Sequence, residues 1–279
     1  MTNAAADAAA DAAAVWDSLP LAGWRTLVTG AASGIGRAIA LGFAQAGADV
    51  ALLGSPRSAE RIAGVAEQIV SAGRRAHVAT VDVVDDDAMR TTVDGAAAEL
   101  GGLDTVVAAA GIAAPSGTAA DAPLSAMTSA KLREVLAVNV RGTWSAVRHA
   151  VPHLRASSRA PSAITIASVA AKRPTHGPYS VSKAAVWMTT RVLAVELAPD
   201  GIRVNAIAPG FIDTPLLHRS APAAHASLDE LAARVPLGRI GQPHEVASTA
   251  IFLASRLSAY LTGAFLTPDG GHVGVNAGG

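Results

Sequence analysis

The sequence predicts an α/β fold: one domain built on a doubly wound, Rossmann-like parallel sheet with helices on both faces. Short apolar runs alternate with longer segments of helical spacing, as in βαβ units. The short runs are apolar throughout, which is expected of strands buried on both faces. A glycine-rich turn follows the first run directly and precedes a helix, an arrangement typical of phosphate-binding turns.

The alternation of segments places each expected element. We expect strands at residues 25–28, 49–53, 77–81, 105–108, 162–167, 203–207 and 264–266. We expect helices at residues 34–47, 58–72, about 130–152 and 179–197. The segments 113–127 and 215–228 are rich in Ala, Ser and Pro or contain several prolines and histidines, and they predict loops or lids of the same domain.

The domain is expected to span residues 19–279, with a substrate loop at about 212–235, because no repeat and no linker composition interrupts it. Residues 1–18 form an alanine-rich tail that carries Asp7 and Asp11. We expect this tail to be disordered or to form a fraying helix. The alternative is an arm that contacts another subunit.

Composition excludes several classes of protein. Hydrophobic residues make up 51% of the 279 residues, charged residues 16%, and the formal net charge is +0. This balance argues against a protein that binds nucleic acid or anionic membranes by electrostatics. The chain has no cysteine, which excludes disulfides and thiolate sites and is compatible with a cytoplasmic location. No apolar run reaches the roughly 18 residues of a membrane span, and no spacing of His, Asp and Glu predicts a metal site.

The glycine-rich turn predicts a dinucleotide site. Gly30 allows a tight turn, Gly34 allows the backbone to approach a pyrophosphate, and Gly36 allows close packing of helix on strand. Ser33 and Ile35 lie between these glycines, where the helix N-terminus offers free N–H groups to phosphates. The spacing is G-x-x-x-G-x-G, and the alternative is a glycine-rich connection that binds no ligand.

The residues after the second strand bear on the choice of nicotinamide cofactor. Binders of NAD usually carry an acidic residue at the end of this strand, which grips the ribose 2′-hydroxyl. Here the position falls at about Gly54, and Ser55 and Arg57 follow, so a 2′-phosphate is favoured. We therefore expect NADP(H), with NAD(H) as the alternative and a solvated Arg57 as the plainer interpretation. Asp82, after the third strand, is expected to accept from the adenine amino group or to cap a turn.

Tyr179 and Lys183 form the pattern from which the chemistry is predicted. Residues i and i+4 share one face of a helix, so the phenol and the ammonium can act at one point. A phenol has a pKa of roughly 10, and a fixed cation nearby favours the phenolate. Such a pair suits proton transfer to or from a carbonyl or alcohol oxygen. A Tyr/Lys pair alone is more often solvent-exposed and without a catalytic role, but here Ser168, Asn139 and the glycine turn accompany it.

Taken together, these motifs resemble the short-chain dehydrogenase/reductase family in its compact single-domain branch, over nearly the whole chain after residue 20. The matching pieces are residues 29–36, Asp82 with Val83, Ala110 with Gly111, Asn139, Ser168, Tyr179 with Lys183, Asn205, Pro209 with Gly210 and Thr214, residues 236–239 with Glu245, and residues 269–271. Each piece is weak alone, whereas their order and spacing are highly specific.

The resemblance implies a role for each catalytic candidate. Tyr179 is expected to act as general acid in reduction or base in oxidation. Lys183 is expected to lower the tyrosine pKa and to hold the hydroxyls of the nicotinamide ribose. Ser168 is expected to bind and polarise the substrate oxygen. Asn139 is expected to anchor, through its backbone, a water relay behind Lys183.

The resemblance also implies where the cofactor lies. The loop residues expected to seat the nicotinamide ring and its carboxamide are Pro209, Gly210, Ile212 and Thr214. Val83, Ala110 and Gly111 are expected to contact the cofactor as well.

In two places the chain departs from the family pattern. The fourth strand ends in Ala108-Ala109-Ala110 where the family has Asn-Asn-Ala, and Ser168 precedes Tyr179 by about two residues fewer than usual. Ser182 is a rival for the serine role.

These observations predict an NAD(P)-dependent oxidoreductase that transfers a hydride between the cofactor and a secondary alcohol or ketone. The alternatives are a non-catalytic dinucleotide-binding regulator, an epimerase or dehydratase, and a 3-oxoacyl-thioester reductase. The loops favour an apolar or weakly polar ketone, whereas a carrier-linked acyl substrate would prefer a basic entrance, for which Arg173 and Arg219 are available. Surplus apolar positions in the helices at 130–152 and 180–197 favour a homotetramer.

Overall fold

The structure, a computed structural model, describes residues 20–114, 122–173, 177–220 and 227–273. The predicted tail at residues 1–18 lies outside the described residues. Seven parallel strands form one sheet in the order β3-β2-β1-β4-β5-β6-β7. The strands are β1 (Arg25–Thr29), β2 (Asp49–Gly54), β3 (Ala76–Thr80), β4 (Thr105–Ala108), β5 (Ser162–Ile166), β6 (Arg203–Ile207) and β7 (Phe265–Leu266). The predicted strands are thus confirmed, each end lying within one residue of its predicted position.

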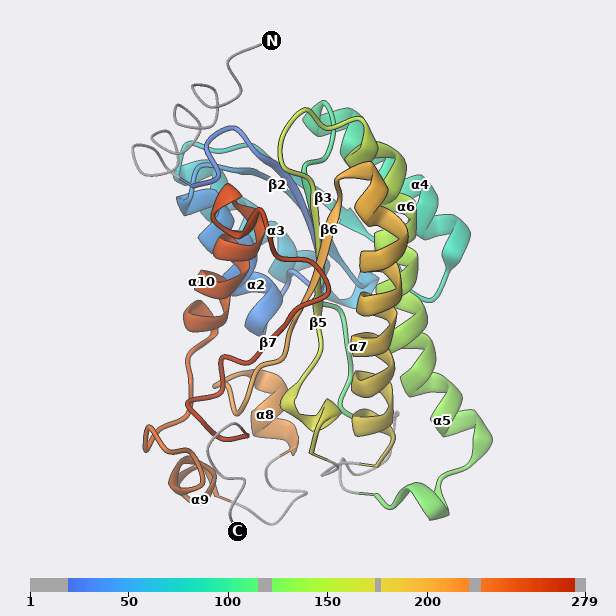
Figure 1. Ribbon diagram of the computed structural model, residues 1–279, viewed down its shortest axis with the longest axis vertical. Helices are drawn as coiled ribbons and strands as arrows, with labels where there is room; N and C mark the ends of the chain where they lie inside the picture. Colours follow the sequence, from blue (N-terminus) through green and yellow to red (C-terminus); the bar gives the residue numbers. More distant parts are fainter. Residues whose placement is uncertain (1–19, 115–121, 174–176, 221–226, 274–279) are drawn as a thin grey trace.

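Helices cover both faces of the sheet (Figure 1). The helices α2 (Gly34–Gln45), α3 (Ala59–Ser71) and α10 (Pro243–Ala254) pack on one face. The helices α4 (Asp86–Leu100), α6 (Gly142–Arg155) and α7 (Gly177–Leu197) pack on the other. The shorter helices are α5 (Ser129–Leu136), α8 (Pro215–Ser220) and α9 (Leu228–Ala233). Connections from β1 and β4 run to opposite faces, so the strand order reverses between these two strands, where α/β proteins bind ligands.

Two helices of the core were not predicted. Helix α4 contains mostly Ala, Thr and Asp, and its core-facing residues Met89, Val93 and Leu100 are widely spaced. Its ends carried the signal, because the Asp85 carboxylate accepts from Ala88 N at 3.0 Å and Gly101 closes the helix with φ of 80°. Helix α10 begins with Pro243 and a capping box from Gln242 to Glu245.

Two segments have a secondary structure different from the one predicted. The helix expected at 130–152 is interrupted by a π-helical turn at Ala137–Arg141, which places Asn139 between α5 and α6. The predicted loop at 215–228 begins as helix α8, with Pro215 at its first position, where proline has no N–H to lose. In the sheet, β3 is an edge strand, so its residues are only partly buried, contrary to the expectation that every strand has both faces covered.

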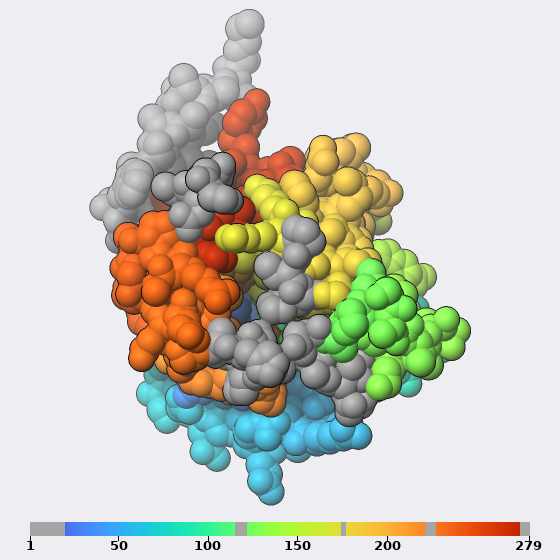
Figure 2. Space-filling model, turned by 90° about the horizontal axis from the view of Figure 1, so that it is seen from below, coloured from blue at the N-terminus to red at the C-terminus, as the bar shows by residue number. Residues whose placement is uncertain are grey.

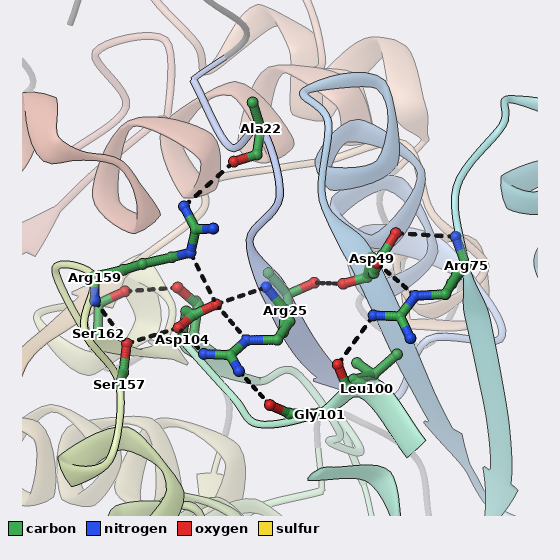
Figure 3. Close-up of polar contacts among 12 residues, drawn as sticks. Ala22, Arg25, Asp49, Arg75, Leu100, Gly101, Asp104, Ser157, Arg159 and Ser162 are labelled. Carbon is green, nitrogen blue, oxygen red and sulfur yellow. Dashed lines mark hydrogen bonds and ion pairs between the residues drawn. The ribbon is translucent and has the colours of Figure 1, made fainter. Parts of the chain in front are cut away.

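A polar cluster joins the amino ends of the central strands (Figure 3). The fully buried Asp104 carboxylate, just before β4, accepts from Arg25 Nε at 2.9 Å and Nη2 at 2.6 Å and from Ser157 Oγ at 2.6 Å. Burial alone would raise the pKa of Asp104, but these hydrogen bonds and the Arg25 charge hold it below its usual value. These paired charges lie at the amino ends of the strands. The opposite, carboxyl ends of the strands are where a parallel sheet binds ligands.

Candidate active site

A cleft lies at the carboxyl ends of β1, β4, β5 and β6. From below, a hollow separates the orange region of α8 and α9 from the yellow region after β5 and at the start of α7 (Figure 2). Fourteen of the predicted site residues line this cleft: Gly30, Ser33, Gly34, Ile35, Gly36, Ala110, Gly111, Ser168, Tyr179, Lys183, Pro209, Gly210, Ile212 and Thr214. The fold therefore brings together residues that lie up to 184 positions apart, from Gly30 to Thr214.

The turn between β1 and α2 is built for close backbone approach. Gly30 has φ of 67°, and a Cβ there would meet Ala110 N at 2.9 Å. A Cβ on Gly36 would collide with the carbonyl oxygen of Gly30. Gly34 also has positive φ, and Ser33 is extended, so the first N–H groups of α2 face the cleft without a side-chain cap. This cradle fits a pyrophosphate at a helix N-terminus.

The alanines that replace the family's asparagines after β4 are still held in place. The Thr29 hydroxyl oxygen accepts from Ala109 N at 3.0 Å and from Ala110 N at 3.1 Å. The side chain at the end of β1 therefore fixes the backbone at the end of β4. Hydrogen bonds to the Thr29 hydroxyl thus order this segment although the asparagine side chains are absent.

Ser168, Tyr179 and Lys183 meet at the end of β5. The hydroxyls of Ser168 and Tyr179 share a hydrogen bond, and Ser168 Oγ also accepts from Ala170 N at 3.2 Å. Lys183 is 4% exposed, and its Nζ donates to Ile166 O at 2.7 Å. The same Nζ lies 5.5 Å from the centroid of the Tyr179 ring. The phenol, the serine hydroxyl and the ammonium thus lie side by side in one partly buried pocket.

Burial dominates the electrostatics of this group. It raises the pKa of Tyr179, and the hydrogen bond from Ser168 only partly offsets the effect. Burial also lowers the pKa of Lys183 to about 8. The expected effect of Lys183 on the tyrosine pKa stays a prediction. The Lys183 ammonium donates its hydrogen bond to the Ile166 carbonyl oxygen, and the raised pKa of Tyr179 in the protein without cofactor follows from desolvation of the phenol.

Asn139 is fully buried and holds the neighbouring backbone. Its Oδ1 accepts from Ile112 N at 2.8 Å, and its Nδ2 donates to Ile112 O and to Ser182 Oγ, each at 2.9 Å. Ser182 Oγ in turn donates to Tyr179 O at 2.7 Å. Ser182 therefore stands behind the cleft, in the support of α7, and Ser168 is the serine that faces the phenol. The side chain of Asn139 has a positioning role that sequence reasoning missed.

The predicted nicotinamide loop is anchored to two other segments. Gly210 N donates to Pro268 O at 3.2 Å, and a Cβ on Gly210 would meet the Asp269 backbone. Ile212 pairs with Gly241 in an isolated bridge. Thr214 Oγ1 donates to Ile212 O at 3.2 Å and accepts from Leu217 N at 3.3 Å, so this hydroxyl caps α8.

Four predicted cofactor residues lie outside the lining of the cleft. Ser55 and Arg57 are exposed just after β2, and Arg57 forms no hydrogen bond or ion pair within the described residues. Asp82 Oδ1 accepts from Val84 N at 3.2 Å, which is the turn-capping role weighed for it. Val83 packs on Gly142 at the start of α6. Leu216, Leu217 and Arg219 of α8 also line the cleft. They lie in the expected substrate loop, but of the three only Arg219 was singled out, as a candidate for a basic entrance.

Known proteins are similar to this chain in sequence and fold. Residues 30–273 match the family model described as enoyl-(acyl carrier protein) reductase. Cis-4-hydroxycyclohexanecarboxylate dehydrogenase of Sinomonas cyclohexanicum is 39% identical over 251 residues, which cover 89% of this chain and 96% of the relative. The chain belongs to the short-chain dehydrogenase/reductase family.

Two further relatives bear on cofactor and reaction. Gluconate 5-dehydrogenase of Gluconobacter oxydans is 34% identical over 264 residues, covering 91% of this chain and 96% of the relative. A short-chain dehydrogenase of Burkholderia cenocepacia, solved in complex with NADP, is 36% identical with a TM-score of 0.81 and covers 91% and 99% of the two chains. This short-chain dehydrogenase/reductase is therefore an oxidoreductase that acts on CH–OH or C=O groups with a nicotinamide cofactor.

The described residues contain neither a cluster of metal ligands nor a helix suited to a membrane. Over residues 20–114, 122–173, 177–220 and 227–273, no three His, Cys, Asp or Glu side chains gather as a metal site. In the same ranges, no helix has the length and apolar content to cross a membrane.

The buried Lys183 should destabilise the protein when no cofactor is bound. Its folded pKa of about 8 lies below its unfolded value of 10.5, so the cost of burying the charge is fully present below pH 8 and disappears as pH rises to 10.5. Lys183→Met should therefore raise the free energy of unfolding at pH 7 by about 1–3 kcal/mol, with the difference shrinking toward pH 10.5. Urea unfolding measures it, with Lys131→Met as the control. A variant less stable than wild type at pH 7 would contradict this account.

Proposed function

We propose that Tyr179, Ser168 and Lys183 carry out proton transfer during the interconversion of a ketone and a secondary alcohol. The observation that carries the proposal is the hydrogen bond between the Ser168 and Tyr179 hydroxyls beside the buried Lys183 ammonium. The nicotinamide cofactor supplies or takes the hydride. In reduction the Tyr179 phenol gives its proton to the carbonyl oxygen as the carbinol C–H bond forms, and in oxidation the phenolate takes that proton back.

Ser168 and Lys183 have separate tasks in this scheme. The Ser168 hydroxyl, fixed by Ala170 N, orients the substrate oxygen toward the phenol and stabilises charge that develops on it. After Tyr179 has given up its proton, the Lys183 ammonium places a positive charge beside the phenolate. Asn139 acts through Ser182 and the Tyr179 backbone, so it positions the first turn of α7.

The cofactor cradle supports the same proposal. The backbone of Gly30, Ser33, Gly34, Ile35 and Gly36 would hold the pyrophosphate at the start of α2. Pro209, Gly210, Ile212 and Thr214, with Ala110 and Gly111 opposite, would enclose the nicotinamide ring. A regulator that only binds a dinucleotide has no physical need for the buried, destabilising Lys183 or for the Ser168–Tyr179 pair, so we favour an enzyme.

Removal of the phenol proton tests the acid/base role. Tyr179→Phe should lower kcat by roughly 10²–10⁴-fold or more, because the ring still packs while the proton donor is lost. The dissociation constant for the cofactor should stay within about 2-fold, as measured by quenching of intrinsic fluorescence. A variant that keeps more than a few per cent of the wild-type rate would overturn the assignment of Tyr179.

We further propose that NADPH is preferred over NADH. No carboxylate follows β2 to repel a 2′-phosphate, and the exposed Arg57 has no partner within the described residues. A carboxylate introduced at Gly54 is a poor test, because a Cβ there would lie 2.6 Å from Ser58 Oγ and 3.0 Å from Ile62 Cδ1.

Arg57→Ala is the better test of cofactor preference. It should lower kcat/KM for NADPH by roughly 10–100-fold, the effect of losing a charge-assisted hydrogen bond, and leave NADH nearly unchanged. Arg61→Ala, an exposed arginine on the next turn, should change neither. Wild-type protein that strongly prefers NADH would contradict the proposal.

We propose a homotetramer and a cytoplasmic location, the latter on the cysteine-free composition. Some of the apolar positions expected to be surplus in the helices at 130–152 and 180–197 are not surplus, because Val147 and Val186 are fully buried in the core of the single chain. The remaining argument is the exposed stripe on α7, formed by Val181, Met188, Val192 and Val195, with exposed Trp144 on α6. Such faces are covered in closed assemblies.

Light scattering at micromolar concentration tests the assembly. We expect a mass of about four chains, each of 27.9 kDa. Val192→Glu should lower this mass, because it places a charge in the stripe. Val70→Glu, at a similarly exposed valine of α3, should leave it unchanged. A wild-type mass of one chain would refute the proposal.

A further inference from the structure

Helix α8 forms one wall of the cleft with a defined face. Pro215, Leu216, Leu217 and Arg219 line the cleft. Pro215 and Arg219 are four residues apart, so they share one side of the helix. His218 turns away from this side, because its Nε2 bonds Asp213 Oδ1 at 2.7 Å. The beginning of α8 lies over the glycine turn, since a Cβ on Gly34 would be 3.4 Å from Thr214 Cγ2 and 4.0 Å from Pro215 Cδ. Arg219 is one helical turn further along, toward the open end.

The charge lining the cleft is positive. Among the described residues that line it, the charged ones are Lys183 and Arg219, and no Asp or Glu faces them. Lys183 is buried and committed to the Ile166 carbonyl. Arg219 is exposed and forms no hydrogen bond or ion pair with any residue in the described ranges. Helix α8 itself contains no acid, and Asp213, two residues before it, is bound by His218.

The guanidinium of Arg219, with no partner among the described residues, is suited to recognise an anion, because it offers paired donors in a fixed fork. We propose that Arg219 binds a carboxylate of the substrate, so that the enzyme acts on a hydroxy- or keto-carboxylate. The reacting oxygen lies at Ser168 and Tyr179, an apolar body packs on Leu216, and the carboxylate reaches Arg219. This inference rests on the proposed function of the cleft, and it replaces the apolar or weakly polar ketone expected from loop composition.

A phosphate of the cofactor has the same chemistry as a substrate carboxylate toward an arginine. The position of Arg219 favours the substrate, since the residues of α8 that adjoin the glycine turn are at its beginning and Arg219 is near its end. A cofactor phosphate and a substrate carboxylate predict different losses of kcat/KM when Arg219 is neutralised. A cofactor contact would affect every substrate equally, whereas a substrate contact would affect only substrates that carry the carboxylate.

The first experiment measures binding without turnover. Cyclohexanecarboxylate and cyclohexanecarboxamide are titrated by calorimetry into protein saturated with NADP. We expect the carboxylate to bind at least about 10-fold more tightly, with the preference shrinking as salt rises. Arg219→Gln should remove that preference, Arg219→Lys should retain part of it, and Arg90→Gln on α4 should leave it unchanged. Equal binding of the two probes by wild type overturns the proposal.

The second experiment measures specificity. For 4-oxocyclohexanecarboxylate and its methyl ester, Arg219→Gln should lower kcat/KM for the acid by roughly 10–100-fold and for the ester by less than about 2-fold. Equal losses with both, together with weaker binding of NADPH, would assign Arg219 to the cofactor and overturn the proposal. The tighter binding of the carboxylate should persist in Tyr179→Phe, because Arg219 is unchanged there. An error in the role of Tyr179 can therefore be told apart from an error in the role of Arg219.

Discussion

The burial of the Lys183 ammonium with no carboxylate partner among the described residues is the constraint on which the rest of the site depends. A buried cation is costly unless polar groups surround it, and here the Ile166 carbonyl at the end of β5 supplies the hydrogen bond. That bond ties the first turns of α7 to the sheet. Asn139 and Ser182 secure the same turns from behind, because they link the backbone of Ile112 to that of Tyr179. The phenol is thereby held against Ser168 before any substrate arrives.

Stability and chemistry are separated along the strands. The amino ends carry paired charges, with Asp104 on Arg25 and Asp49 on Arg74 and Arg75. Arg203 is also buried there, and its guanidinium donates to the carbonyls of Leu253, Ser255 and Ser258. Burial lowers its pKa to about 10, and the carbonyls that end α10 supply the compensating negative potential. The carboxyl ends, by contrast, keep hydroxyls and an ammonium directed at a cleft.

Much of this could be predicted from the sequence because the signals were local. Strands buried on both faces read as apolar runs, and the spacing of Gly30, Gly34 and Gly36 between a strand and a helix is typical of a phosphate-binding turn. Tyr179 and Lys183 share a helical face by spacing alone. Helix α4 was missed because alanines and threonines bury little apolar surface per residue, so its periodicity was weak. The cap at Asp85 and the terminal Gly101 were its readable signals.

Other features depend on three-dimensional packing and have no local signature. The raised pKa of Tyr179 reflects burial by distant segments, which no i, i+4 spacing reports. The contacts of Asn139 join residues 27 and 43 positions away. Arg219 lines the cleft only because α8 folds over the glycine turn. At the adenine end, Ser55, Arg57 and Asp82 have the positions expected after β2 and β3, but their contacts with a cofactor are a proposal.

The central claim is that this cleft transfers a hydride directly between the cofactor and a carbinol carbon while Tyr179 moves the proton. The most direct measurement uses NADPH carrying deuterium at C4 with a ketone substrate, followed by mass spectrometry of the alcohol. The account predicts one deuterium on the carbinol carbon from one of the two C4 faces, and a slower reaction with that labelled cofactor. Alcohol formed with no deuterium from either face, or cofactor oxidised while the ketone stays intact, would contradict it.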